Sequence, residues 1–398
     1  MEGQGLEKLE AAFREGRLLS PRWDGPGFVD LAQALGVLAG GRPRAEASPA
    51  ALGLLDRIGT AEKHVFILAD GLGLEMLGRL PEGGFLRRHL AGELRAVFPS
   101  TTAAALATLL TGDWPGAHAS LAWHLYLPER DLSIRPLPFD SRFGNRPLGG
   151  MGVPAGEVFA LPGRFFGPRG CCAVVPKDLV GSTFTSLNAG PSLGYGEGGD
   201  WLRALGQALD LPDTRFVYCY LPEPDRTGHD QGCQGAPYLE TLAGLERQLE
   251  AFWKGRPGGA RLILSADHGM VDSLEAGRYR FGASDPLVEP LAALPSGEAR
   301  VPFFHVKPER GRDFVEAFRK VFGDDFILVS GAEARRSGLF GPSGPCPRAA
   351  ARLGDWMAVS AGGRLLDFES PFFRRDKPMV GHHGGLSPAE MRIPLVLA

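Results

Sequence analysis

Aspartate and histidine residues stand at the ends of predicted strands in this chain. Each of three short apolar runs is followed by such residues: Asp70 after Val65–Ala69, Asp225 and His229 after Phe216–Leu221, and Asp267-His268 after Leu262–Ala266. A further pair, His382-His383, precedes the apolar run Ile393–Leu397. Uniformly apolar short runs are typical of parallel strands covered on both faces, and such strands end at one edge of their sheet. The sequence therefore predicts that these side chains converge.

Three carboxylates and three imidazoles form two sets of three metal ligands. Mixed nitrogen and oxygen donors suit zinc, and three protein ligands leave each ion a position for substrate or water. Two divalent cations beside three aspartates leave a local charge of about +1 when the imidazoles are neutral. This charge favours an anionic substrate such as a phosphate.

A hydroxyl nucleophile is predicted at Thr102. The mostly apolar run Leu94–Phe98 predicts a short strand. The segment Phe98-Pro99-Ser100-Thr101-Thr102 then leads into a helix predicted over Ala103–Leu110, and Gly112 stands at the usual end position. Coordination to a metal lowers the pKa of a hydroxyl, and the first turn of a helix points N–H groups at an incoming anion. The plain alternative is that Thr101 or Thr102 only caps this helix.

Each of these pieces has an ordinary structural alternative. Asp70 before Gly71 is also a common turn residue, and Asp225 with His229 also fits a surface pair. Four strand-end motifs of one chemical kind are hard to explain by turns alone. Their joint occurrence favours the metal site.

Composition limits the function classes further. The 398 residues carry a formal net charge of −3, which gives no reason to expect a nucleic-acid polymer or an anionic membrane as partner. The first residues have no apolar core like that of a signal peptide, and no apolar stretch is long enough for a membrane span, so we expect a cytoplasmic protein. Five cysteines without Cys-x-x-Cys spacing are expected to be free thiols.

The predicted elements divide the chain into three parts. Residues 1–275 are expected to hold a helical lead-in and the metal-binding core, with Gly- and Pro-rich, site-shaping loops at 113–200. Residues 276–379 alternate strands and helices between Pro/Gly stretches and are expected to form an inserted α/β cap. Residues 380–398 return to the core with the last ligand and a final strand.

The order of these motifs resembles the alkaline phosphatase superfamily, closest to its type I phosphodiesterase/nucleotide pyrophosphatase branch. The motifs in question are Asp70-Gly71, Thr102, Thr111-Gly112-x-x-Pro115-x-x-His118, Asp225-x3-His229, Asp267-His268-Gly269 and His383-Gly384. The resemblance covers roughly 64–125, 214–272 and 380–398. It implies an α/β fold, a three-layer αβα sandwich around a mostly parallel sheet.

Carried over residue by residue, the resemblance implies two metal sites. Asp70, Asp267 and His268 would hold the metal that activates Thr102, and Asp225, His229 and His383 would hold the second. We choose His383 over its neighbour His382 because the ligand of the family directly precedes glycine. Zinc is the expected metal, with manganese as the alternative. The implied reaction is the hydrolysis of a small phosphate ester through a phosphothreonine intermediate.

One residue departs from the pattern of the phosphodiesterase/nucleotide pyrophosphatase branch. The branch that cleaves nucleotide diesters has an asparagine three positions after the nucleophile, whereas this chain has Ala105. Alternative functions are a phosphomutase or a sulfatase of the same superfamily, although Thr102 argues against the usual nucleophiles of both. A regulatory module that binds metals without turnover is the alternative from another class. The sequence leaves the oligomeric state open.

Overall fold

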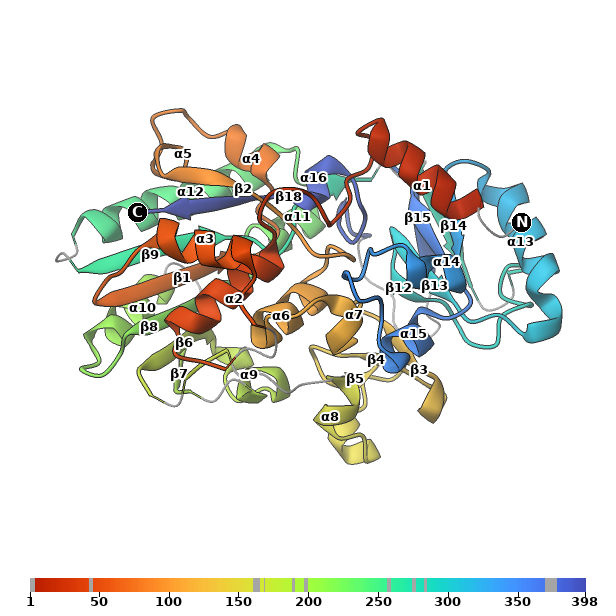
Figure 1. Cartoon of the computed structure of the whole chain (residues 1–398), viewed down its shortest axis with the longest axis horizontal. Helices are drawn as coiled ribbons and strands as arrows, with labels where there is room; N and C mark the ends of the chain where they lie inside the picture. The colour runs from red at the N-terminus through yellow and green to blue at the C-terminus, as the bar shows by residue number, and fades with distance from the viewer. Residues whose placement is uncertain are drawn as a thin grey trace.

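A seven-stranded, mostly parallel sheet forms the centre of the molecule (Figure 1). The computed structural model describes residues 4–42, 46–159, 165–167, 169–187, 190–196, 200–255, 259–273, 277–282, 285–368 and 378–398. The sheet runs in the order β2 (Leu90–Arg95), β18 (Arg392–Leu397), β9 (Ala260–Ser265), β1 (Lys63–Ala69), β8 (Phe216–Leu221), β6 (Cys171–Pro176) and β7 (Ser192–Tyr195). Strands β9, β1, β8, β6 and β7 are parallel, while β18 is antiparallel to β2 and β9.

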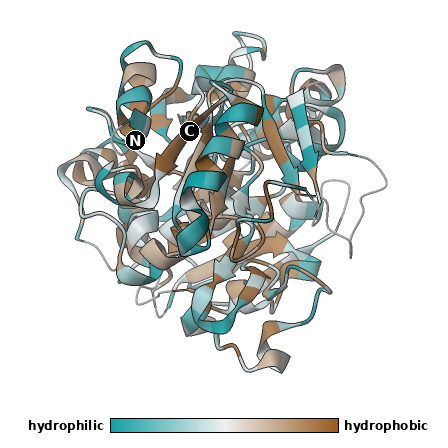
Figure 2. Ribbon diagram, turned by 90° about the vertical axis from the view of Figure 1, so that its right-hand side faces the viewer, coloured by the Kyte–Doolittle hydropathy of each residue, from teal (hydrophilic) through white to brown (hydrophobic). Residues whose placement is uncertain are grey.

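Helices cover both faces of this sheet. Helices α2 (Phe28–Leu38), α3 (Pro49–Ile58) and α6 (Thr102–Thr111) pack together on one face, and α10 (Asp200–Asp210) and α12 (Ala236–Lys254) lie on the other (Figure 1). Much of the ribbon of the strands is coloured as hydrophobic, and hydrophilic stretches are prominent on the outer helices (Figure 2). The predicted three-layer αβα class is confirmed. Among the described residues, no helix has both the length and the apolar character needed to cross a membrane.

The apolar runs identified the three central strands. Strands β1, β8 and β9 have almost entirely buried side chains, as expected for strands covered on both faces. Two predictions are wrong. The segment 113–200 contains two further core strands, β6 and β7, and buries Cys171 and Cys172 in β6. The strand expected at Leu94–Phe98 is β2, four residues earlier, and it is antiparallel at the sheet edge.

A second, smaller sheet stands beside the core (Figure 1). Its strands lie in the order β12 (Ser296–Glu298), β13 (Val301–Phe304), β15 (Trp356–Ser360) and β14 (Phe326–Ser330), and α13 (Gly311–Phe322) packs into a separate hydrophobic cluster there. Helix α1 (Gln4–Arg14) lies against β14, so close that a Cβ atom on Gly5 would collide with the carbonyl of Leu328. The division into a core and a cap at 276–379 stays a prediction.

Short elements complete the described chain. The strands are β3 (Leu125–Leu127), β4 (Leu132–Arg135), β5 (Asp140–Ser141), β10 (Val271–Asp272), β11 (Arg278–Phe281), β16 (Leu365–Phe368) and β17 (Gly381–His382). The helices are α4 (Leu74–Gly78), α5 (Phe85–Arg88), α7 (Pro115–His118), α8 (Ala155–Val158), α9 (Thr183–Leu187), α11 (Asp225–Gln231), α14 (Gly331–Arg336), α15 (Pro347–Leu353) and α16 (Pro388–Met391).

A buried ion pair ties the small sheet to the core. Arg300, between β12 and β13, donates to the two carboxylate oxygens of Glu390 in α16 at 2.7 and 3.1 Å. Both side chains are almost fully buried. The same carboxylate accepts the N–H of Gly385 at 2.7 Å and the hydroxyl of Ser387 at 2.6 Å. This pair therefore fixes the segment that follows His383.

Replacing Arg300 by methionine is expected to destabilise the fold by about 3–5 kcal/mol, because Glu390 would keep a buried charge without its partner. Urea unfolding followed by circular dichroism measures this loss. Arg310→Met is the control, since Arg310 pairs with Asp313 on the exposed surface and its loss should leave the unfolding midpoint unchanged. Equal stability of Arg300→Met and wild type would contradict the expectation.

Candidate active site and metal centre

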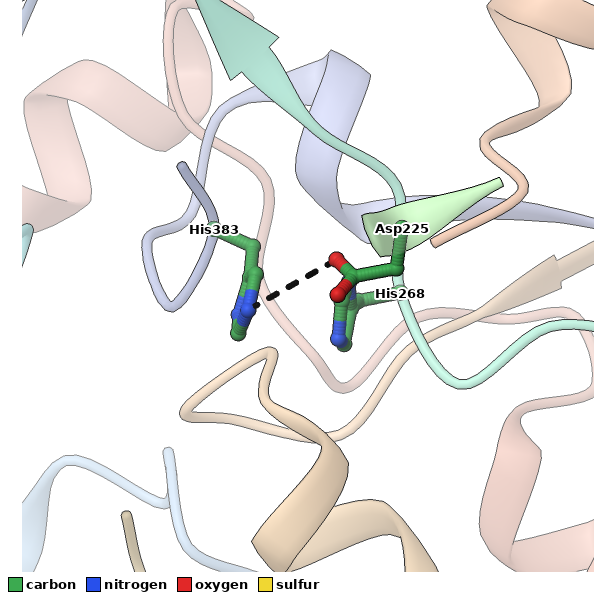
Figure 3. Close-up of side chains that lie close together, drawn as sticks. All are labelled: Asp225, His268 and His383. Carbon is green, nitrogen blue, oxygen red and sulfur yellow. Dashed lines mark ion pairs between the residues drawn. The ribbon is translucent and has the colours of Figure 1, made fainter. Parts of the chain in front are cut away.

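The predicted ligands come together at the carboxyl edge of the main sheet. Asp70 follows β1, Asp225 and His229 lie in α11 after β8, Asp267 and His268 follow β9, and His383 follows β17. Two groups have ligand atoms that all lie within 4.8 Å of one another: Asp70 with Asp267 and His268, and Asp225 with His268 and His383. Figure 3 shows the second group, in which the three side chains face one another. The convergence inferred from strand order is therefore present.

His268 stands between the two groups. Its Nε2 atom lies 3.5 Å from Oδ1 of Asp70 and 3.3 Å from Oδ2 of Asp267. Its ring stacks on that of His383 with centroids 3.8 Å apart. On the other side, Nε2 of His229 lies 3.2 Å from Oδ2 of Asp225. Nε2 of His383 lies 3.9 Å from Oδ1 of the same carboxylate, the pair drawn dashed in Figure 3.

Backbone carbonyls orient all three imidazoles in the same way. The Nδ1 atoms of His229, His268 and His383 lie 2.8, 3.1 and 3.1 Å from the carbonyl oxygens of Gly381, Gly269 and Ser100. An Nδ1–H that donates to a carbonyl leaves Nε2 unprotonated and directed at the cluster. Metal-binding histidines are held in this way, through their second ring nitrogen.

The carboxylates of the cluster fit bound cations. Burial, followed by the negative charges of Asp267 and Asp225, raises the pKa of Asp70 well above its usual value. Within the described chain, Oδ1 of Asp225 and Oδ2 of Asp267 are buried and receive no hydrogen bond. Buried acceptors and clustered negative charges are costly unless they are neutralised. Two divalent cations would satisfy both, so the residues fit a two-metal site.

Thr102 is the first residue of α6 and faces this cluster. Its Oγ1 atom lies 3.2 Å from Nε2 of His268 and 3.5 Å from Oδ1 of Asp70. Thr101 is the N-cap residue but makes no side-chain capping bond, so the capping alternative does not explain the pair. Ser100 joins this turn to the last ligand segment, because its hydroxyl donates to Gly385 at 2.8 Å and accepts from the N–H of Gly384 at 3.2 Å.

The structure distinguishes the two adjacent histidines. Nε2 of His382 lies 3.2 Å from the carbonyl of Met379 and 3.2 Å from Nη2 of Arg278, away from the aspartates. His383 instead contributes to the cluster around Asp225. We therefore keep His383 as the proposed ligand.

Removing the imidazole of His383 is expected to release one of two bound metal ions, because Asp225 and His229 alone hold an ion weakly. His383→Ala and His382→Ala form a matched pair, to be compared by metal analysis after gel filtration. We expect one ion per chain in His383→Ala and two in His382→Ala. The reverse pattern would assign the site to His382.

Two polar residues that the motifs did not reveal support the site. Tyr220, near the end of β8, donates to Oδ2 of Asp70 at 2.5 Å and so orients this carboxylate. Glu298 of β12 accepts the N–H of Trp123 at 2.7 Å, and burial raises its pKa. A tyrosine in an apolar strand reads as an ordinary core residue, and Glu298 reaches the site only through the tertiary fold.

A cavity of about 1050 Å³ opens over Thr102 and Asp70. One wall of the cavity comes from β11, β12 and β16. Phe303 and Phe304 are buried in hydrophobic clusters and do not line this cavity. Phe281 and Phe368 line it.

Sequence comparison identifies one family. Residues 192–320 match the family model described as type I phosphodiesterase/nucleotide pyrophosphatase. The predicted resemblance is confirmed. The matched segment contains four of the six clustered side chains, Asp225, His229, Asp267 and His268. The prediction of an enzyme class, the hydrolases of phosphoric esters, is confirmed with this family. None of the curated proteins compared with the chain matches it.

Solved structures agree with this family in their fold. Murine ectonucleotide pyrophosphatase/phosphodiesterase 5, an inactive variant in complex with AMP, is 16% identical, with a TM-score of 0.62 over 84% of this chain and 87% of that one. Phosphonoacetate hydrolase from Sinorhizobium meliloti, in complex with phosphonoacetate, is 16% identical, with a TM-score of 0.59 over 85% and 90% of the two chains. At these identities the likeness shows the fold alone.

Proposed function

We propose that this protein hydrolyses small phosphoric esters, diesters before monoesters, at a two-metal site with Thr102 as nucleophile. The observation that carries the proposal is the position of Oγ1 of Thr102, 3.2 Å from His268 and 3.5 Å from Asp70. A hydroxyl that lies beside two proposed ligands of one metal is close enough to be activated by that metal. A helix-capping threonine needs no such neighbours.

The two proposed ligand sets keep the allocation inferred from the sequence. Asp70, Asp267 and His268 form the set next to Thr102, and Asp225, His229 and His383 form the other. When bound, a pair of divalent cations lowers the pKa of a coordinated hydroxyl or water and neutralises charge on the attacking and leaving oxygens. Imidazole and carboxylate donors favour zinc, with manganese as the alternative.

The residues of the chain supply the remaining steps. Oγ1 of Thr102 attacks phosphorus, the P–O bond to the leaving alcohol breaks, and a phosphothreonine forms. The first turn of α6 directs backbone N–H groups at the phosphoryl oxygens. Water then attacks the same phosphorus, the bond to Oγ1 breaks, and phosphate or a phosphate monoester leaves. Tyr220 holds Asp70 in place during both steps.

The family match and the geometry support this function together. The matched family consists of phosphodiesterases and nucleotide pyrophosphatases, and the cavity is much larger than one phosphate group. A diester with a sizeable organic group fits that volume. The solved relatives bind AMP and phosphonoacetate, which are small phosphorus compounds.

A panel of chromogenic esters tests the proposal. We expect release of p-nitrophenol from bis-p-nitrophenyl phosphate, slower release from p-nitrophenyl phosphate, and none from p-nitrophenyl sulfate. A chelator should abolish turnover, and zinc or manganese should restore it. Two stoichiometric metal ions without turnover of any ester would favour the non-catalytic module, and turnover of the sulfate alone would favour a sulfatase.

Other properties stay predictions from the sequence. These are the cytoplasmic location and the absence of a nucleic-acid polymer as partner.

The retention of configuration at phosphorus that two successive in-line displacements require is measurable with a chiral thiophosphate diester. Inversion would contradict the phosphothreonine intermediate while leaving a metal-dependent hydrolase in place.

A further inference from the structure

One arginine in the wall of the cavity lies against aromatic rings. Arg142 lines the cavity above Thr102, and its guanidinium lies over two aromatic rings, 5.2 Å from the centroid of Phe143 and 5.5 Å from that of Phe368. Its Nη1 donates to the carbonyl of Pro295. Within the described chain, no carboxylate lies within ion-pair distance of it.

A second arginine of the same wall offers a comparison. Arg135 donates from Nε and Nη2 to the two carboxylate oxygens of Asp140 at 2.8 and 2.5 Å, and again from Nη2 to Asn145 at 2.9 Å. Its charge is therefore matched inside the protein. A guanidinium carries five N–H donors, and the single carbonyl bonded to Arg142 leaves most of them available.

Burial lowers the pKa of Arg142. Loss of hydration lowers its pKa to about 10, although the negative charges of Asp367 and Glu298 act in the opposite direction. The side chain still carries a full positive charge at neutral pH. A partly buried cation without a paired anion loses part of its hydration, and an anion that enters the cavity would compensate for that loss.

The geometry of the guanidinium suits a particular kind of anion. A planar fork matches the two oxygens of a carboxylate or a phosphate, and a guanidinium that lies over aromatic rings can still donate its N–H groups to such oxygens. The rings also restrict the side chain before a ligand binds, so less conformational freedom is lost.

We propose that the substrate carries a second anionic group on its organic part, a carboxylate or a phosphate, and that Arg142 binds this group. The inference rests on the proposed ester hydrolysis, since the first anionic group is the phosphoryl centre at Thr102. The substrate class is therefore a phosphoric ester whose alcohol is itself anionic. Arg142 acts as a specificity determinant, remote from the reacting atoms.

Three sets of p-nitrophenyl phosphodiesters test this assignment, one set for each linker of two, three or four methylene groups. Within a set, the second alcohol ends in a carboxylate, an uncharged carboxamide or a phosphonate. At one linker length or more, we expect the kcat/KM of wild-type enzyme to be at least about tenfold higher for an anionic end than for the carboxamide. This is the size of effect expected of a charge-assisted hydrogen bond. The anionic end with the higher kcat/KM, carboxylate or phosphonate, identifies the kind of group that Arg142 binds.

Arg142→Gln should lower the ratio of kcat/KM for the anionic ester to kcat/KM for the carboxamide ester to about 2 or less. The reason is that a hydrogen-bonding side chain remains but the charge is lost. Arg142→Lys should give a lower ratio than wild type, since lysine keeps the charge without the fork. Arg135→Gln is the matched control. It removes a positive charge from the same wall, yet should keep the wild-type ratio because that charge is already neutralised.

The outcomes are distinct. A wild-type ratio near 1 at every linker length overturns the inference without any variant, and so does an unchanged ratio in Arg142→Gln. An equal fall in Arg135→Gln also overturns it, by showing a general effect of charge. Absence of p-nitrophenol release from all the esters would instead reject the proposed hydrolysis itself.

Discussion

Replacing Thr102 by alanine is expected to lower kcat/KM for bis-p-nitrophenyl phosphate by at least about 10³-fold, because the variant has no hydroxyl to attack phosphorus. Both metal ions should stay bound, since all six proposed ligands remain. Steady-state kinetics and metal analysis of the same preparation measure the two quantities. Thr102→Ser keeps a hydroxyl and should regain a large part of the activity.

Thr101→Val is the matched control for this prediction. Thr101 is also buried at the start of α6, and its side chain makes no capping bond. Valine keeps the shape of threonine, so activity should remain within about tenfold of wild type. Wild-type turnover in Thr102→Ala would exclude a covalent phosphothreonine. A loss of metal in that variant would show that Thr102 is needed for binding.

Changing Asp267 to asparagine is expected to release one metal ion and to lower kcat/KM by at least about 10³-fold. Oδ1 of Asp267 accepts the N–H groups of Gly71 at 3.1 Å and His268 at 3.0 Å, and an asparagine oxygen can keep both bonds. Oδ2, which receives no hydrogen bond, would become an NH₂ group that repels a cation. The local backbone is therefore preserved while the ligand is lost.

Asp230→Asn provides the control for metal loss. Asp230 lines the same cavity and is exposed, but it lies outside both ligand groups. The same change of charge should leave two ions per chain, as measured by metal analysis alongside thermal unfolding. Two retained ions in Asp267→Asn would remove Asp267 from the proposed metal site. One ion in Asp230→Asn would mean that general electrostatics holds the metals.

The central strands were predictable because burial on both faces gives an unmistakable run of apolar residues. Strands β1, β8 and β9 have such runs, and the proposed ligand residues stand at or just beyond their ends. Strand β6 was missed because Cys171-Cys172-Ala173 is a weak strand signal among glycine- and proline-rich loops. Strand β2 was misplaced because Ala96–Phe98 are buried without belonging to a strand.

The parts of the site that depend on distant segments could not be predicted. Glu298 and Arg142 reach the cavity because the small sheet and the segment that follows β5 fold over the core edge, and no local pattern marks either residue. Tyr220 points at Asp70 through the alternation of β8, which is visible only when the strand order is known. Residue type at strand ends pointed to the proposed ligands, and tertiary structure supplied the residues that orient them or line the cavity.

The bonds between Ser100 and the Gly384-Gly385 segment join residues that a ribosome makes far apart in time. Ser100 and Gly384 are separated by 284 positions, so at about 5–20 residues per second their synthesis is separated by roughly 15–60 s. The proposed ligand set of Asp70, Asp267 and His268 is translated well before His383. A nascent chain can therefore assemble the half of the site around Thr102 first, and it gains a complete centre only when the late segment docks onto Ser100.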